Sequence, residues 1–219
     1  MTDFAAARRT MVDGQLRTFD ITDQNVLAAV LAIPRERFVP LAAAGIAYQD
    51  SEIVVGGHGH RRMLKPMVLA KMLQSAEISP SDHVLDVGSG TGYSAAVMGK
   101  LAAQVVALEE DPALVRHARQ NLDSIGAHNV SVAEGCLANG WPAVAPYDVI
   151  VLDGGAETVP PALLAQLKPS GRLVGVVGSG PAPKATVYRL VEGQFSGWPV
   201  FDASAPLLPG FERPPAFHF

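Results

Sequence analysis

The chain has 219 residues, of which 48% are hydrophobic and 17% are charged, so it can bury a large core and is not a disordered chain. A formal net charge of −4 argues against a general nucleic-acid binder, and one cysteine, Cys136, excludes an internal disulfide framework and a cysteine-based zinc site. No apolar run reaches membrane-spanning length, and no apolar segment of the signal-peptide type follows Met1. We therefore expect a soluble, cytoplasmic protein.

The first 79 residues are predicted to form a helical N-terminal appendage that ends in a loop. Apolar residues at helical spacing predict helices over residues 4–18, 23–33 and 67–78. Thr22 is expected to cap the second helix, and Pro34 to end it. Residues 56–60 predict a flexible segment, and since no third ligand is placed near His58 and His60 by spacing, we expect no metal site.

The stretch from residue 84 to residue 110 is the most informative part of the chain. Residues 84–87 form an apolar run of strand length, and Gly88, Gly90 and Gly92 then predict a tight turn that a ligand can approach closely. Residues 93–101 predict a crossover helix, and residues 104–108 predict a buried parallel strand. Glu109 and Glu110 follow at the end of that strand.

The rest of the chain repeats this alternation of strands and helices. Further helices are predicted over residues 111–125 and 160–167, and further strands over residues 129–133, 147–152, 171–177 and 186–191. The spacing favours an α/β fold of Rossmann-like, doubly wound type, with a mostly parallel sheet. We expect an appendage at residues 1–79, a cofactor-binding domain at 80–194, and an edge strand with a tail at 195–219.

A strand, a glycine turn and an acid about 20 residues later are typical of nucleotide-cofactor sites, where the acid binds the ribose hydroxyls. A dinucleotide site has the spacing G-x-G-x-x-G, but this turn has G-x-G-x-G with Asp86 just before it. Asp86 would repel a pyrophosphate and suits a cationic ligand. The segment therefore resembles the S-adenosylmethionine site of class I methyltransferases, with Asp86, Gly88, Ser89, Gly90, Gly92 and Glu109 as the expected cofactor-binding residues.

Several separated stretches resemble one family, the protein-L-isoaspartate O-methyltransferases. The most specific lie in the appendage, at residues 11–16, 34–40 and 47–50, and others lie at residues 84–92, 146–148, 160–167 and 171–178. The resemblance implies an enzyme that transfers a methyl group from S-adenosylmethionine to the α-carboxylate of isoaspartyl residues in damaged proteins. It also implies that residues 59–66 form the substrate loop.

The chain departs from the pattern of this family at three places. Leu64 stands where the substrate loop of the family carries a serine, so no hydroxyl remains in that loop. Gly135 and Cys136 replace the start of a Gly-Asp-Gly motif at the adenine position, where Cys136 cannot replace a carboxylate acceptor. Asp153 replaces a small residue after the fourth strand and is a candidate for the missing acceptor. Cys136 itself is expected to be a buried structural thiol.

The substrate loop brings new positive charges in Arg61, Arg62 and Lys65. They either bind an acidic acceptor or form a solvated basic turn, and an arginine too close to the sulfonium would oppose cofactor binding. We treat Leu64, Arg61 and Arg62 as the candidate catalytic positions. Of the two glutamates, Glu109 fits the ribose position better, and Glu110 is expected to be exposed.

Three hypotheses for function follow. The first is an isoaspartyl methyltransferase whose partners are damaged proteins or peptides, not nucleic acids or membranes, and which is a monomer or a homodimer. The second is a divergent methyltransferase that acts on another carboxylate or hydroxyl. The third is a non-catalytic protein that binds S-adenosylmethionine.

Overall fold

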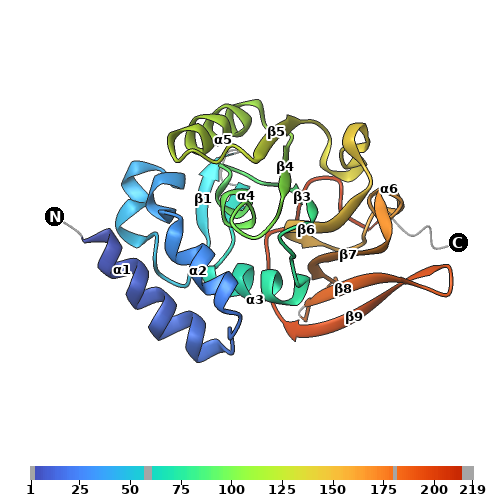
Figure 1. Ribbon diagram of the computed structural model, residues 1–219, viewed down its shortest axis with the longest axis horizontal. Helices are drawn as coiled ribbons and strands as arrows, with labels where there is room; N and C mark the ends of the chain where they lie inside the picture. Colours follow the sequence, from blue (N-terminus) through green and yellow to red (C-terminus); the bar gives the residue numbers. More distant parts are fainter. Residues whose placement is uncertain (1–2, 57–60, 180–181, 214–219) are drawn as a thin grey trace, which may run out of the picture.

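A seven-stranded sheet forms the centre of the molecule, with the strand order β5-β4-β3-β6-β7-β8-β9 (Figure 1). The computed structural model describes residues 3–56, 61–179 and 182–213, so His58 and His60 lie outside the described residues. The five strands from β5 to β7 pair in parallel, and β8 and β9 are antiparallel. Within these residues, no helix combines the length and the apolar character needed to cross a membrane. The fold is the expected doubly wound, mostly parallel α/β fold.

The strands of this sheet agree with most of the predicted segments. Their bounds are β3 (His83–Val87), β4 (Gln104–Glu109), β5 (Val130–Glu134), β6 (Tyr147–Ala156), β7 (Leu167–Val177), β8 (Lys184–Val191) and β9 (Gln194–Asp202). β6 is longer than predicted, because the segment 153–156 continues the strand instead of leaving it. β9 confirms the predicted edge strand at the start of the C-terminal region.

The helices lie where apolar spacing places them, with differences at their ends. They are α1 (Phe4–Met11), α2 (Gln24–Ala32), α3 (Pro66–Ala76), α4 (Tyr93–Met98), α5 (Pro112–Ser124) and α6 (Pro161–Leu164). α1 continues into a π-helical turn at Val12–Leu16 and a 3₁₀ turn at Arg17–Phe19. Thr22 does not cap α2, since the carboxylate of Asp23 accepts the backbone N–H groups of Asn25 and Val26 instead.

The appendage also contains a small hairpin that periodicity did not predict. Strand β1 (Ile53–Gly56) pairs antiparallel with β2 (Arg61–Met63). The burial of β2 alternates, with Arg61 and Met63 buried and Arg62 exposed. A strand of this kind sends successive side chains to opposite faces, so Arg61 and Arg62 point in opposite directions.

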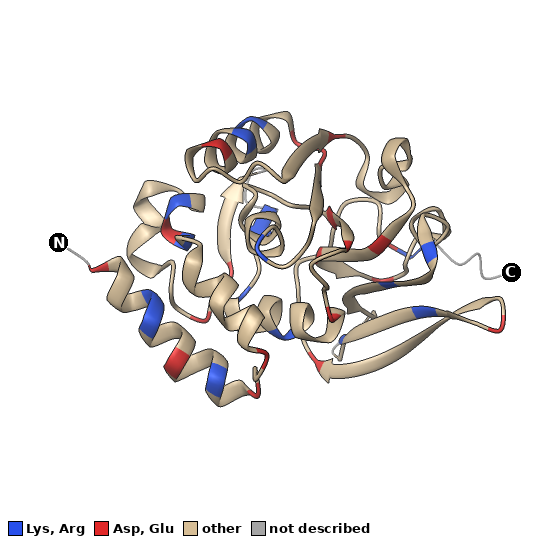
Figure 2. Cartoon of the chain, in the orientation of Figure 1, with Lys and Arg blue, Asp and Glu red and all other residues tan. Residues whose placement is uncertain are grey.

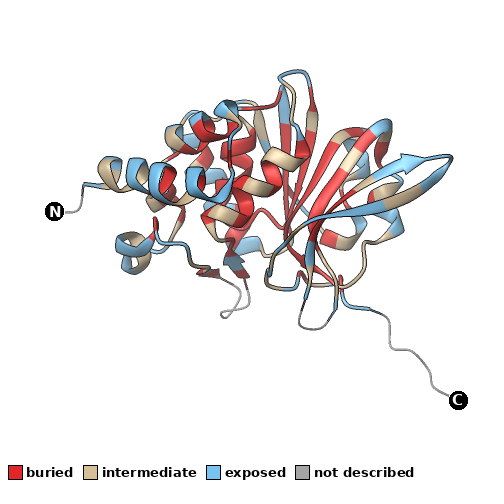
Figure 3. Ribbon diagram, turned by 90° about the horizontal axis from the view of Figure 1, so that it is seen from below, coloured by how far each residue is buried: buried red, intermediate tan, exposed pale blue. Residues whose placement is uncertain are grey.

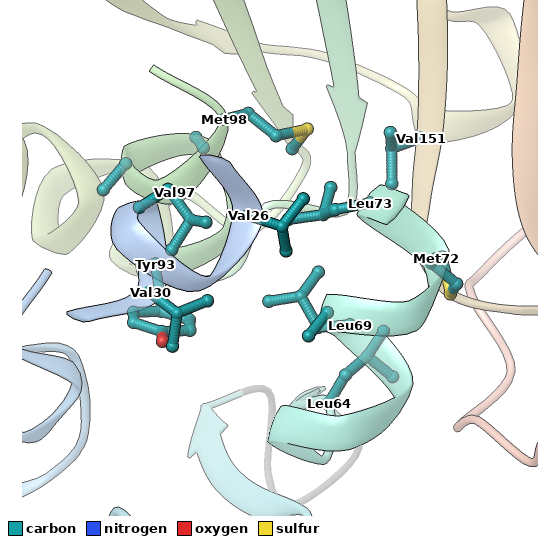
Figure 4. Packing of buried hydrophobic residues seen from close by; sticks show 14 of the residues in the cluster. Val26, Val30, Leu64, Leu69, Met72, Leu73, Tyr93, Val97, Met98 and Val151 are labelled. Atoms are coloured by element: carbon teal, nitrogen blue, oxygen red, sulfur yellow. The ribbon is translucent and has the colours of Figure 1, made fainter. Parts of the chain in front are cut away.

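Two apolar cores cover the two faces of the sheet. The larger core joins the appendage, α3, α4 and α5 to the sheet, and Figure 4 shows Val26 and Leu69 near the centre of this cluster, with Tyr93 and Val151 on opposite sides of it. The smaller core lies on the other face and includes Phe211 from the C-terminal tail. In Figure 3 the buried residues follow the central strands, while β9 is mostly exposed.

Polar contacts join distant segments across these layers. Arg172 on β7 donates to the carbonyl oxygens of Ala76 and Glu77 and to the carboxylate of Asp82, which fixes the end of α3 against the sheet. The Thr91 hydroxyl donates to the Phe38 carbonyl oxygen at 2.6 Å, which joins the glycine turn to the appendage. Acidic and basic residues are interspersed along the chain in Figure 2.

Candidate functional site

The glycine turn follows β3 at the point where the strand order of the sheet reverses. β4 lies on one side of β3 and β6 on the other, and open α/β sheets bind ligands in the crevice that such a reversal creates. Gly88 and Gly90 have φ angles of +84° and +56°, a left-handed backbone that favours glycine. The N–H groups of Gly88 and Ser89 both donate to the Leu108 carbonyl oxygen, so the turn is fastened to β4.

Glu109 lies at the end of β4, directly beside this turn, and its side chain is fully buried. One carboxylate oxygen, Oε1, accepts the backbone N–H groups of Glu110 and Asp111. The other, Oε2, accepts the Gly90 N–H at 2.8 Å and the Arg61 Nη2 at 2.7 Å. Glu109 is therefore the acid that contacts the glycine turn. Glu110 is partly exposed, and none of these hydrogen bonds joins its side chain to the turn.

A second acidic group lies on the α4 side of the turn. Asp86 on β3 and Asp153 on β6 are both buried, and the hydroxyl oxygen of Ser94 lies 2.6 Å from Asp86 Oδ2 and 2.7 Å from Asp153 Oδ2. A hydroxyl has only one hydrogen to donate. One of the two carboxyl groups must therefore carry a proton and donate it to the Ser94 oxygen when both bonds are formed.

Burial is the main cause of the proton affinity of this pair. It raises the pKa of Asp153 to about 6, against an ordinary value of 3.8, although the Ser94 hydrogen bond and the Arg61 charge act the other way. Burial and the neighbouring charge of Asp153 also raise the pKa of Asp86. The Oδ1 atoms of both residues have no hydrogen-bond partner among the described residues, which leaves two buried acceptors free for a cationic ligand.

Asp153 does not lie next to Cys136, the position that resembles the adenine site of the family. The strand order separates the two places, because Asp153 belongs to β6, next to β3, whereas Cys136 follows β5, two strands away on the other side. Ser94 joins Asp153 to Asp86 instead.

Cys136 is exposed, so the expectation of a buried thiol was wrong. It follows β5, which lies at the edge of the sheet and has no neighbouring strand to cover its end. Gly135 and Cys136 line a cavity of about 710 Å³, whose other lining residues are Arg61, Glu110, Asp111, Glu134 and Pro209. Arg61, which pairs with Glu109, connects this cavity with the glycine turn.

The four loop positions singled out in the sequence are not brought together. Leu64 is 1% exposed and packs into the larger core near Leu69, as Figure 4 shows. Arg62 is exposed, and Lys65 lines a different cavity together with residues of β9. Arg61 alone among them reaches the glycine turn, where it contacts Glu109 and the Gly88 carbonyl oxygen.

The C-terminal tail lies across the same turn. Two backbone hydrogen bonds join Gly155 to the tail. The Gly155 N–H donates to the Pro206 carbonyl oxygen at 2.7 Å, and the Leu208 N–H donates to the Gly155 carbonyl oxygen at 2.8 Å. Leu208 is then so close to the turn that a Cβ added at Gly88 would lie 2.7 Å from its Cδ2. This described part of the tail thus covers the site and is not an outlying segment.

Sequence reasoning missed three residues of this site. Ser94 is a hydroxyl in the otherwise apolar helix α4, a signal that could have been noticed. Arg35 is fully buried and donates to the carbonyl oxygens of Ala47 and Leu64. Its Cζ lies 4.8 Å from the centroid of the Tyr93 ring. Burial lowers the pKa of Arg35, and the interaction with Tyr93 is the largest effect that opposes this lowering. Leu208 gave no signal in the sequence.

Comparisons with known proteins identify the family of this chain. The family model of protein-L-isoaspartate(D-aspartate) O-methyltransferase matches residues 7–196. A protein-L-isoaspartate O-methyltransferase of Methylorubrum extorquens is 43% identical over 188 residues, which are 86% of this chain and 80% of that protein. One of Koribacter versatilis, with the same name, is 40% identical and covers 89% of this chain and 86% of its own.

Solved structures give the same result for the fold. A protein-L-isoaspartate O-methyltransferase with 26% identity has a TM-score of 0.80, and the match covers 93% of this chain and 66% of that chain. A putative enzyme of this kind from Plasmodium falciparum, solved with S-adenosyl-L-homocysteine, is 19% identical and also has a TM-score of 0.80, with 92% and 97% coverage. The family match and the identity over most of the chain show that this protein belongs to the protein-L-isoaspartate O-methyltransferase family.

Proposed function

We propose that the protein uses S-adenosylmethionine to methylate the α-carboxylate of isoaspartyl residues in proteins. The observation that carries this proposal is the placement of buried acids on two sides of one glycine turn, Glu109 on one side and the Asp86 and Asp153 pair on the other. Family membership supports the same reaction. The function is that of a protein repair enzyme.

The residues present fit this cofactor by their chemistry. Asp86 and Asp153 each have a buried, unpartnered Oδ1, and such an atom is costly to bury unless a ligand donates to it. They would hold the cationic methionine end. Glu109 would accept the ribose hydroxyls, the backbone of Gly88, Ser89, Gly90 and Gly92 would line the cofactor, and the cavity at Gly135 and Cys136 would take the adenine.

When bound, S-adenosylmethionine supplies a methyl group on a cationic sulfonium. The acceptor carboxylate is already ionised at pH 7, with a reference pKa of about 4, so the chain needs no general base. Its residues contribute by holding the two reactants in line and by excluding water. The transfer forms an ester bond to one carboxylate oxygen and breaks the bond between methyl carbon and sulfur.

A divergent acceptor is the second candidate, and the position of Leu64 favours it. The side chain that replaces the hydroxyl of the family is buried in the larger core, and Arg61 is paired with Glu109. Of the two loop arginines, Arg62 is the exposed one and the candidate for contact with an acidic acceptor. In this second candidate, the methyl acceptor is an acidic group other than an isoaspartyl carboxylate.

The test is transfer of a labelled methyl group to an isoaspartyl peptide, beside the matching aspartyl peptide. The proposal expects transfer to the isoaspartyl peptide alone. Cofactor binding without transfer to either peptide contradicts the isoaspartyl assignment and favours the divergent acceptor.

A matched pair of variants then tests the cofactor site. Glu109→Gln places an amide donor against backbone N–H groups, so we expect it to weaken binding of S-adenosylhomocysteine by about tenfold or more, the effect of losing roughly one charged hydrogen bond. Glu192→Gln makes the same change at the exposed turn between β8 and β9, and it is expected to stay within about threefold of the unchanged protein. Equal effects of the two variants would contradict the placement of the ribose at Glu109.

We also propose that the enzyme acts in the cytoplasm. Its single cysteine, Cys136, is exposed and unpaired, which suits a reducing compartment. Fractionation of the source cells with an antibody against the protein would test this placement.

A further inference from the structure

The carboxylate of Glu109 has no acceptor position left for a ribose. An ionised carboxylate offers about four lone-pair sites, two on each oxygen. In this structure Oε1 accepts from the Glu110 and Asp111 N–H groups, and Oε2 accepts from the Gly90 N–H group and Arg61 Nη2. The three backbone donors belong to the turns that shape the site, so Arg61 is the one donor that can leave without unfolding them.

Arg61 is held in this position by more than one contact. Its Nη2 also donates to the Gly88 carbonyl oxygen at 2.8 Å, and the residue is 7% exposed. It lies so close to the turn that a Cβ at Gly88 would be 3.1 Å from Nη2. Its Nε, in contrast, is buried and has no partner among the described residues, which makes the position incompletely satisfied.

We propose that Arg61 is an affinity-determining residue that competes with the cofactor ribose for Glu109. The inference rests on the cofactor site assigned above and adds an internal competitor to it. For a ribose to reach Glu109, the guanidinium must leave Oε2. Glu110 and Glu134 line the adjoining cavity together with Arg61, so two other acidic residues are available there as partners for the guanidinium.

This competition has a defined thermodynamic signature. A ligand that binds only the molecules with a free site has an apparent dissociation constant equal to the intrinsic one divided by the fraction of such molecules. If Arg61 is paired in nine molecules of ten, its removal tightens binding about tenfold. The same removal leaves Glu109 buried without its cation, which destabilises the ligand-free protein and makes its thermal stability depend more strongly on ligand.

The experiment measures binding of S-adenosylhomocysteine by calorimetry to the unchanged protein, Arg61→Gln and Arg116→Gln. Arg116 is exposed on α5, so its variant makes the same change of charge away from the turn. We expect Arg61→Gln to bind about tenfold tighter and Arg116→Gln to bind within about twofold of the unchanged protein. We also expect the ligand to raise the melting temperature of Arg61→Gln by more than that of the unchanged protein.

Arg61→Lys serves as a second variant if Arg61→Gln does not fold. A lysine keeps the charge but loses the planar fork, so it should hold Glu109 less well and tighten binding by a smaller factor, about threefold. Unchanged or weaker binding by the variants that fold would overturn the competition, because Arg61 would then be neutral or a ligand of the cofactor. If the unchanged protein binds in that case, the proposed function stands without this inference. If no variant binds, the cofactor site and the inference are both overturned.

Discussion

Asp86 and Asp153 come from neighbouring strands and share a single hydroxyl, that of Ser94. The arrangement places two acids in a buried site with one proton between them. Such a site is poorly suited to the empty protein and well suited to a cation, because a positive ligand can replace the proton. The pair therefore connects ligand binding with protonation.

Replacement of Asp153 by asparagine should change how stability depends on pH. The folded pKa of Asp153, about 6, is above the ordinary 3.8 because burial penalises its charge. The protonated carboxyl group of Asp153 therefore stabilises the folded protein fully below the unfolded pKa, and this stabilisation is lost as pH rises through about 6. We expect the free energy of unfolding of Asp153→Asn, relative to the unchanged protein, to increase by on the order of 2 kcal/mol between pH 4.5 and pH 7.

Urea unfolding at a series of pH values measures this difference, with Asp148→Asn as the control. Burial raises the pKa of Asp148, but hydrogen bonds from Lys168 and the His83 N–H outweigh this, so the net pKa is lowered. Its titration in the folded and unfolded states lies at or below the ordinary value of 3.8, so the control difference should be flat over the same pH range. A flat difference for Asp153→Asn as well would contradict the buried pair.

Removal of the Ser94 hydroxyl should destabilise the ligand-free protein. Ser94→Ala leaves Asp86 Oδ2 and Asp153 Oδ2 without their shared partner, and an unsatisfied buried polar group costs about 1–3 kcal/mol. Ser124→Ala removes an exposed hydroxyl from the end of α5 and should cost less than about 0.5 kcal/mol. Denaturant unfolding at pH 7 compares the two, and equal losses would mean that Ser94 does not bridge the acids.

Cys136 gives a direct test of where the adenine lies. The thiol is exposed and lines the same cavity as Arg61, so a small alkylating reagent should modify it readily in the ligand-free protein. S-adenosylhomocysteine should slow the modification in proportion to the fraction of protein that holds ligand, and most strongly at a saturating concentration. Mass spectrometry follows the reaction cleanly because the chain has one cysteine. A rate that ligand does not change would place the adenine elsewhere.

Arg172 is expected to matter for stability and not for cofactor affinity. It donates to two backbone carbonyl oxygens at the end of α3 and to Asp82, and its side chain is 12% exposed. Arg172→Ala should therefore cost about 3 kcal/mol, near the lower end for breaking a buried ion pair. Arg189, opposite it on β8, pairs with Glu77 at an exposed position, so Arg189→Ala should cost less than about 1 kcal/mol. Thermal unfolding of both variants measures the contrast.

The local features of the site could be predicted from the sequence. The glycine turn, Asp86 and Glu109 lie within one strand, turn, helix and strand unit, so their order in the chain sets their order in space. The exposure of Cys136 was predicted wrongly, because it depends on which strand lies at the sheet edge. The sequence order of the strands does not reveal that position.

The contacts that control the site could not be predicted, because they join side chains far apart in the chain. Arg61 and Glu109 are separated by 48 positions, and Ser94 and Asp153 by 59. Periodicity indicates which face of an element is apolar, but not which polar side chain of another element meets it. The same limit explains why Leu208, in a tail without a regular pattern, was not linked to Gly88.

The hydrogen bond from Thr91 to the Phe38 carbonyl oxygen joins the glycine turn to the appendage. A displacement of Phe38 is therefore transmitted to the glycine turn through this hydrogen bond. If the glycine turn holds the cofactor as proposed, substitutions around Phe38 should change cofactor affinity although they lie in the appendage.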